Sequence, residues 1–314
     1  MIAATPSQLT RTRINEANRF PPPPPSLSDP ALAAHLASLD ESLFQTGRLI
    51  TCGLYASLIL KDYVRTILAL NRSPTSWNLD PRSNSSKLPQ GRGNQVSVEF
   101  NLVYRWHSAL SERDGTWVGE ELKSVLGGKE PEEVGVGEMV RALAKWEESI
   151  PAKPEERRFG GLARQADGTY EDQELVKVWC DSVEDIAGVF GANKVPNALR
   201  SIEGLGIMQA RHWNVATLNE FRAFLGLTKH TTFEDINPDP VVAVKLKSLY
   251  DSPDAVELYP GLMVEKPTPP MDPGSGLCVN YTTSRAILSD AVALIRGDRF
   301  HTVDYTPRSV TNWG

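Results

Sequence analysis

Apolar residues in this chain of 314 residues recur at steps of three and four, and alternation with a period of two is scarce. Steps of three or four place side chains on one face of an α-helix, whereas a half-buried strand needs alternation. Between Leu49 and Leu70 apolar residues occupy most faces, which predicts a buried helix within a helical region that begins near Asp40. Amphipathic stretches predict further helices at residues 136–149, 172–189, 217–226, 239–251 and 282–296. The sequence therefore predicts a mainly α fold in one domain.

The start of the chain and two later segments have a different character. Pro21–Pro25 is a run of prolines, and proline lacks the amide hydrogen that a helix interior needs. We therefore expect a Pro-rich, poorly ordered start over residues 1–39 and one domain over residues 40–314. Asn71–Gly93 is rich in Ser, Asn and Pro and is predicted as a loop. Val96–Leu110 predicts a second apolar helix, or an extended entry followed by a helix.

Composition and charge exclude several classes of protein. A net charge of −6 and a pI of about 5.5 offer no basic surface for nucleic acid. Lys61, Asp62 and Arg65 interrupt the longest apolar region, which argues against a membrane-spanning helix. Met1–Asn15 lacks the apolar segment of a signal peptide, and three widely spaced cysteines indicate neither a disulfide framework nor a metal site. We expect an intracellular protein, cytoplasmic or peripheral to membranes, and not a secreted one.

The segment Glu99–Ser108 carries the most chemistry. On a helix, Tyr104 and His107 would share a face, and Arg105 and Trp106 would project elsewhere. A neutral imidazole can ligate haem iron, and a phenol one turn away can give an electron and a proton to oxidised haem, which leaves a tyrosyl radical. From spacing alone, a Tyr and a His on one face are more often packing or surface residues, so this pair does not define a haem site by itself.

Phe100–Ser108 resembles the helix of cyclooxygenases and fungal linoleate diol synthases that carries the pattern Tyr-x-Trp-His. The resemblance implies that Tyr104 is the radical-forming residue, that His107 is the proximal iron ligand and that Trp106 is the tryptophan before it. Further blocks that resemble the superfamily follow in its order: Ile207–Trp213, Leu218–Arg222, Phe233–Asp235, Leu249–Glu265 and Ile295–Phe300. Three segments resemble the fungal diol synthases and psi-factor-producing oxygenases in particular: Leu43–Tyr63, Asp304–Pro307 and Thr311–Gly314.

This resemblance implies a helical domain like that of the animal haem peroxidases, with haem b as cofactor. The implied activity is the dioxygenation of a linoleate-like fatty acid to a hydroperoxide, with a polyunsaturated fatty acid and O2 as partners. Arg105 is a candidate partner for a haem propionate, or else a solvated helix residue. Arg211 is a candidate buried charge partner near haem or a carboxylate, or else part of a structural salt bridge. Peripheral membrane contact and a homo-oligomer are compatible with this interpretation.

The chain departs from the family before His107. The family's distal haem histidine and a calcium-binding loop lie well upstream of the proximal histidine. His35 is the only earlier histidine here, and we expect it to be a solvated loop residue. We therefore expect a dioxygenase domain that is incomplete at its N-terminal side. A non-catalytic remnant and a simple haem peroxidase are the alternatives to a fatty-acid dioxygenase.

A second departure concerns the partner of the proximal histidine. Many animal-type peroxidases place an Asn beside its non-ligating nitrogen, and Gly206 falls at that place here. Because glycine offers no side-chain acceptor, we expect the imidazole to bond a backbone carbonyl or water. We expect His230 and His301 at the surface, and His212 packed or capping a helix without a chemical role.

Overall fold

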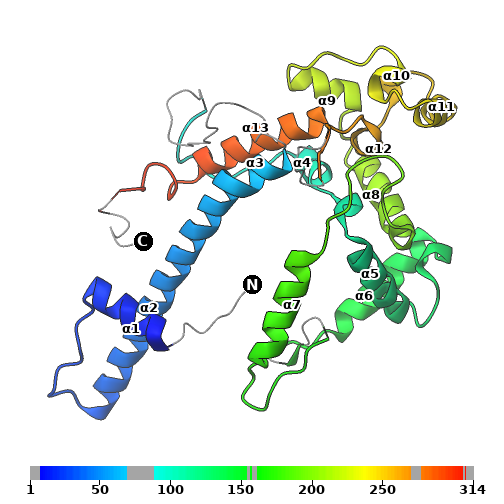
Figure 1. Ribbon diagram of the computed structural model, residues 1–314. Helices are drawn as coiled ribbons and strands as arrows, with labels where there is room; N and C mark the ends of the chain where they lie inside the picture. Colours follow the sequence, from blue (N-terminus) through cyan, green and yellow to red (C-terminus); the bar gives the residue numbers. More distant parts are fainter. Residues whose placement is uncertain are drawn as a thin grey trace. The chain divides into compact units, whose positions relative to one another are not determined.

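The computed structural model describes residues 8–68, 88–153, 156, 157, 161–269, 277–306 and 308. The described part is helical, and its only β pairing consists of isolated bridges such as that of Thr217 with Glu257. The helices are α1 Gln8–Asn18, α2 Asp29–Leu58, α3 Val64–Ile67, α4 Val98–Val103, α5 Glu112–Val125, α6 Val136–Ser149, α7 Asp172–Glu184, α8 Arg200–His212, α9 Leu218–Phe224, α10 Phe233–Ile236, α11 Pro240–Leu249, α12 Leu258–Val264 and α13 Tyr281–Gly297 (Figure 1). The prediction of a mainly α fold is confirmed.

Most helices predicted from periodicity form near their predicted bounds. Residues 136–149 are helical throughout, and 282–296 lies within α13. The helix predicted at 172–189 ends at Glu184. Most of the predicted loop Asn71–Gly93, together with Thr311–Gly314, lies outside the described residues. The division into residues 1–39 and 40–314 stays a prediction.

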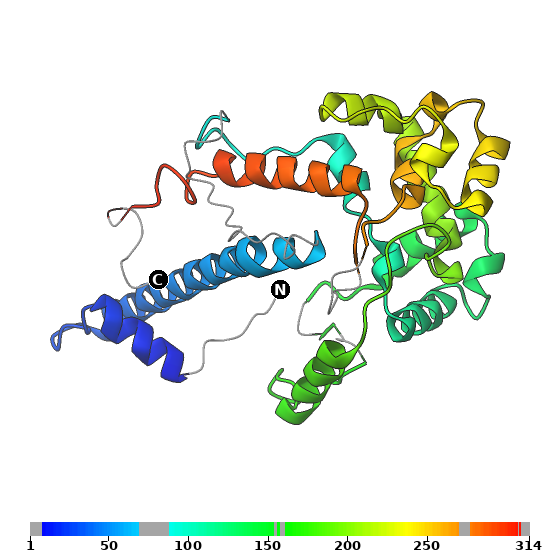
Figure 2. The same ribbon diagram turned by 45° about the horizontal axis from the view of Figure 1, so that its top comes forward.

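The chain divides into two compact units. The first comprises residues 1–66, 73–95 and 291–314, and the second comprises 67–72 and 96–290. In the first unit α2 continues through a π-helical turn, Ile59–Tyr63, as one rod (Figures 1 and 2). Pro30 in its first turn suits a helix start, so α2 begins at Asp29 and not near Asp40. Together α1 and α2 place helical structure in the described part of residues 8–39, and the expected poorly ordered start stays a prediction.

The expected burial of Leu49–Leu70 is wrong for the part that lies in α2, whereas Val64, Ile67 and Leu68 at its end are buried. Within α2 only Leu43 is buried, whereas Leu54 and Tyr55 are 61% and 66% exposed. A helix with apolar residues on every face is buried only if other elements cover every face. Among the described elements of its unit, α1 packs on α2 and covers only part of it. By length and composition alone, Asp29–Tyr63 is apolar enough to cross a membrane, because Lys61 and Asp62 lie at its end. The charges of Lys61, Asp62 and Arg65 therefore do not exclude a membrane-spanning helix.

In the second unit α8 packs against α6 and α12, and α12 also contacts α9 and α4. Side-chain caps start several of these helices: Ser97 accepts from the Phe100 amide at the start of α4, and Thr217 and Glu220 form a capping box at α9. Gly261 lets α12 approach α9, because a Cβ there would lie 2.9 Å from the Cβ of Leu218. These helices bury six large apolar side chains: Leu102, Val103, Leu218, Leu258, Tyr259 and Leu262.

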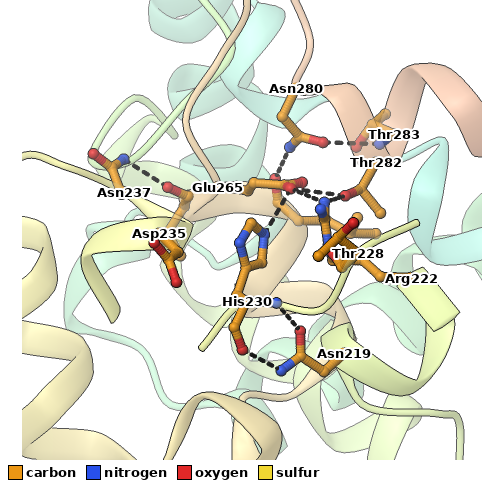
Figure 3. Close-up of polar contacts among 12 residues, drawn as sticks. Asn219, Arg222, Thr228, His230, Asp235, Asn237, Glu265, Asn280, Thr282 and Thr283 are labelled. Atoms are coloured by element: carbon orange, nitrogen blue, oxygen red, sulfur yellow. Dashed lines mark hydrogen bonds and ion pairs between the residues drawn. The ribbon is translucent and has the colours of Figure 1, made fainter. Parts of the chain in front are cut away.

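A buried polar cluster fixes the C-terminal end of α12 (Figure 3). Glu265, at the C-cap of α12, accepts through Oε1 from Arg222 Nη1 at 2.5 Å and from Thr282 Oγ1 at 2.7 Å. His230 Nε2 lies 3.0 Å from the same oxygen. The side chains of Arg222 and Glu265 are 10% and 5% exposed, so the pair is shielded from water. The cluster therefore ties α9 and the start of α13 to the helix that carries Tyr259.

Candidate haem-ligand site

The segment with Tyr104 and His107 is not one continuous helix. The helix α4 ends at Val103, and Tyr104 is its C-cap with φ −96° and ψ 20°. Trp106 Nε1 donates to the Val103 carbonyl at 2.9 Å, and Arg105 Nε donates to the Asn101 carbonyl at 3.2 Å. These side chains thus occupy carbonyls to which backbone amides would donate if the helix continued. His107 then opens a short 3-10 turn that ends at Ala109. The expectation that Tyr104 and His107 share a helical face is wrong.

Aromatic contacts hold Tyr104 after the helix has ended. Its ring stacks on Trp106 with a centroid distance of 4.5 Å and an interplanar angle of 23°. It also packs against Phe100 with centroids 5.3 Å apart. Such pairs stabilise by about 0.5–1.5 kcal/mol beyond buried area. Tyr104 is 40% exposed, so the ring is held by two neighbours and still open at the surface of its unit.

His107 has a carboxylate partner. Its Nδ1 forms a short hydrogen bond with Glu203 Oε1, and the two side chains are 31% and 20% exposed. The hydroxyl of Tyr259 lies 2.8 Å from each Glu203 oxygen and donates its one proton to this carboxylate. Burial raises the pKa of the Tyr259 phenol, and the negative charge of Glu203 raises it further. The expectation of a backbone carbonyl or water partner is therefore wrong, because Glu203, one helical turn before Gly206, forms this hydrogen bond.

Gly206 has a different role from that of the family's Asn. A Cβ on Gly206 would lie 2.7 Å from Arg105 Nη1, so the glycine leaves room for the guanidinium. Arg105 Nη2 donates to Asn101 Oδ1 at 2.5 Å and bonds Gln209, and its Cζ lies 5.7 Å from the ring centroid of Tyr259. Arg105 thus joins the end of α4 to α8 and is not a freely solvated residue.

Arg211 is exposed and paired. It contacts Glu257 with two nitrogens at 2.5 and 3.0 Å, and its side chain is 65% exposed. Tyr250 also donates to Glu257, at 3.0 Å, and burial raises the pKa of Tyr250 to about 12. The expected burial of Arg211 is wrong, and the structural salt bridge is what the structure contains. Haem contacts by Arg105 and Arg211 stay predictions.

The other histidines lie elsewhere. His230 belongs to the buried cluster of Figure 3, with a side chain 11% exposed, so the expected surface position is wrong. His35 lies on α2 and not in a loop, and its Nε2 is buried. His212 is exposed at the end of α8, and His301 pairs with Asp298 near the surface.

The residues present fit a haem ligand. Within the described part of the chain, no group of three or more His, Cys, Asp or Glu side chains could hold a metal ion. The site offers one imidazole, and its Nε2 makes no hydrogen bond to any described residue. A single axial imidazole is what haem iron requires, because the macrocycle supplies the other nitrogens. A carboxylate on the second ring nitrogen is a frequent partner of a ligating histidine.

Comparison with known proteins identifies the family. The animal haem peroxidase family matches residues 32–312, which is most of the chain. The chain therefore belongs to the animal haem peroxidase family.

Individual relatives narrow the resemblance. Linoleate diol synthase of Gaeumannomyces graminis is 57% identical over 308 residues, which cover 96% of this chain and 26% of that protein. Psi-producing oxygenase A of Aspergillus fumigatus is 56% identical over 306 residues, covering 96% of this chain and 28% of the relative. The chain thus spans about a quarter of the length of these curated relatives. A crystallised Oryza sativa fatty acid alpha-dioxygenase with palmitic acid has a TM-score of 0.56 at 16% identity, over 96% of this chain and 49% of that one, which shows a shared fold.

Proposed function

We propose that this chain is the part of a haem-dependent fatty-acid dioxygenase that binds the iron through His107 and carries the radical-forming Tyr104. The observation that carries the proposal is the imidazole of His107, fixed by Glu203 on one nitrogen and without a hydrogen bond to the described residues on the other. The similarity to linoleate diol synthase supports a linoleate-type substrate. The family supports haem, and we propose haem b with His107 as its iron ligand.

When bound, haem supplies the one-electron oxidising chemistry. Tyr104 then acts as a hydrogen-atom carrier. Its phenoxyl oxygen takes a hydrogen from the carbon between two double bonds, so that the C–H bond breaks and the phenol O–H bond forms. O2 adds to the carbon radical, and the peroxyl oxygen takes the hydrogen back from Tyr104. The fatty acid and O2 become a hydroperoxide, and the tyrosyl radical is restored.

The environment of Tyr104 suits this task. Stacking on Trp106 and packing on Phe100 limit the orientations of the ring, which favours attack at one carbon of a bound chain. Its exposed fraction of 40% leaves room for an acyl chain to approach. The protein therefore acts mainly by positioning the Tyr104 ring and the acyl chain and by excluding side reactions.

We further propose that the protein works inside the cell, in the cytoplasm or at a membrane surface where its apolar substrate accumulates. The exposed apolar residues of α2, such as Leu54, Tyr55 and Leu58, support peripheral membrane contact. Flotation of the purified protein with phospholipid vesicles tests this; recovery only in the vesicle-free fraction would contradict membrane contact.

The decisive experiment compares two variants of the full gene product. His107→Ala should abolish or strongly shift the Soret band, because the imidazole that would hold the iron is lost. Tyr104→Phe removes one hydroxyl and keeps the stacked ring, so it should retain the Soret band and lose O2 uptake with linoleate. O2 uptake retained in Tyr104→Phe would refute the assigned role. Peroxidase turnover without O2 uptake in the unaltered protein would instead support a simple haem peroxidase.

A further inference from the structure

We propose that Glu203 and Tyr259 are a pair of positioning residues that fix the tautomer of His107 and increase electron donation from its ligating nitrogen. This inference rests on the proposed function. Three elements bring the residues together: His107 follows α4, Glu203 lies on α8, and Tyr259 lies on α12. No sequence pattern connects them, because His107 and Glu203 are 96 positions apart.

The chemistry of the groups sets the direction of each hydrogen bond. An ionised carboxylate only accepts, so the hydroxyl of Tyr259 must donate to Glu203, which it contacts at 2.8 Å on both oxygens. For the same reason His107 must donate from Nδ1 to Glu203. A neutral imidazole with its proton on Nδ1 carries its lone pair on Nε2, so Nε2 is the ligand atom.

Glu203 is not committed to a structural salt bridge. Among the described residues no Lys or Arg pairs with its carboxylate, and its hydrogen-bond partners are His107 and Tyr259. The nearby guanidinium of Arg105 lies over the ring of Tyr259. Tyr259 itself is 2% exposed, so the packing around its ring favours the position in which its hydroxyl meets Glu203.

A carboxylate acceptor raises the basicity of the ligating imidazole more than an amide acceptor would. Hydrogen bonding from the second ring nitrogen to an acceptor raises the basicity of a ligating histidine, and a charged acceptor is stronger than a neutral one. The family's Asn would give a neutral acceptor, whereas this chain has Gly206 at that place and Glu203 one turn earlier. We therefore expect an electron-rich axial ligand and a low haem reduction potential. Tyr259 moderates the effect, because the hydrogen bond from its hydroxyl withdraws charge from Glu203.

The test uses two variants with opposite expectations. Glu203→Gln replaces the carboxylate by a neutral amide, so the iron–histidine stretching frequency should fall and the midpoint potential should become more positive. Tyr259→Phe removes a donor from Glu203 and should move both quantities the other way. Haem affinity should fall about 10–100-fold in Glu203→Gln, the usual effect of losing such a partner. Glu138→Gln, which removes a surface ion pair with Lys129, is the matched control and should leave the stretching frequency, the midpoint potential and the haem affinity unchanged.

A measurement without haem separates this inference from the proposed function. In the haem-free protein, ¹⁵N chemical shifts of His107 should show the proton on Nδ1, and Glu203→Gln should shift the Nδ1 resonance. If haem binds but both variants move the potential in the same direction, or neither moves it, Glu203 and Tyr259 are only structural. If the unaltered protein binds no haem while the haem-free shifts agree, the proposed function fails and the hydrogen-bond assignment stands.

Discussion

Replacing Arg222 by Met should be the most destabilising single change in the buried cluster of Figure 3. Arg222 donates to Glu265, Thr282 and the carbonyl of Thr228, and its side chain is 10% exposed. Met fills a similar volume without a charge, so the loss is mainly electrostatic. Glu265 would remain buried with one charge-compensating donor fewer, and removing one partner of a buried ion pair costs about 3–5 kcal/mol.

This loss is large beside the usual stability of a domain, about 5–15 kcal/mol. Thr282→Val gives the scale of a neutral hydrogen bond, since it deletes one hydroxyl in the same cluster and should cost about 0.5–1.5 kcal/mol. The double variant Arg222→Met/Glu265→Gln removes both charges, so it should be more stable than the sum of the two single losses predicts. The opposite charges, and not the shape, would then account for most of the cost.

Urea denaturation of the purified protein, followed by circular dichroism, measures these differences through the transition midpoint and slope. A cost for Arg222→Met no greater than that for Thr282→Val would refute the reasoning. Additive losses in the double variant would show that Arg222 and Glu265 act independently, in spite of their 2.5 Å contact.

Three further changes test other parts of the structure. Gly206→Ala should add about 1 kcal/mol of helix propensity to the free energy of unfolding, but the new methyl group displaces Arg105, so the net change should be small. In an Arg105→Met background, the same substitution should raise the free energy of unfolding. Asp235 accepts hydrogen bonds from Thr231 and Thr232, which lower its pKa from 3.8 to about 2. Its stabilising effect is present above pH 3.8 and lost as the pH falls toward 2, so Asp235→Asn should flatten the measured stability in that window. Met139 is 1% exposed and packs with Leu126 and Val134, so Met139→Ala should cost about 2–5 kcal/mol in urea denaturation; less than 1 kcal/mol would contradict this packing.

The sequence determined the local features. Periodicity predicted α6 and the position of α13, because each helix buries a regular stripe that its own residues specify. The run of Tyr104, Trp106 and His107 indicated the family through residues close together in the chain, and the family match over residues 32–312 confirms that identification. Both kinds of signal depend on near neighbours, so a single sequence is enough to contain them.

Tertiary structure decided the rest of the site. The helix α4 ends at Val103 because the indole of Trp106 takes the Val103 carbonyl, which a period of three or four residues does not predict. Glu203 meets His107 only after α8 has packed beside the end of α4, so the periodicity of the sequence does not predict this contact. One usable signal existed, a carboxylate one turn before Gly206. Burial likewise depended on neighbours: the same apolar pattern that predicted a buried α2 leaves Leu54 exposed, since a side chain is buried only where another element covers it.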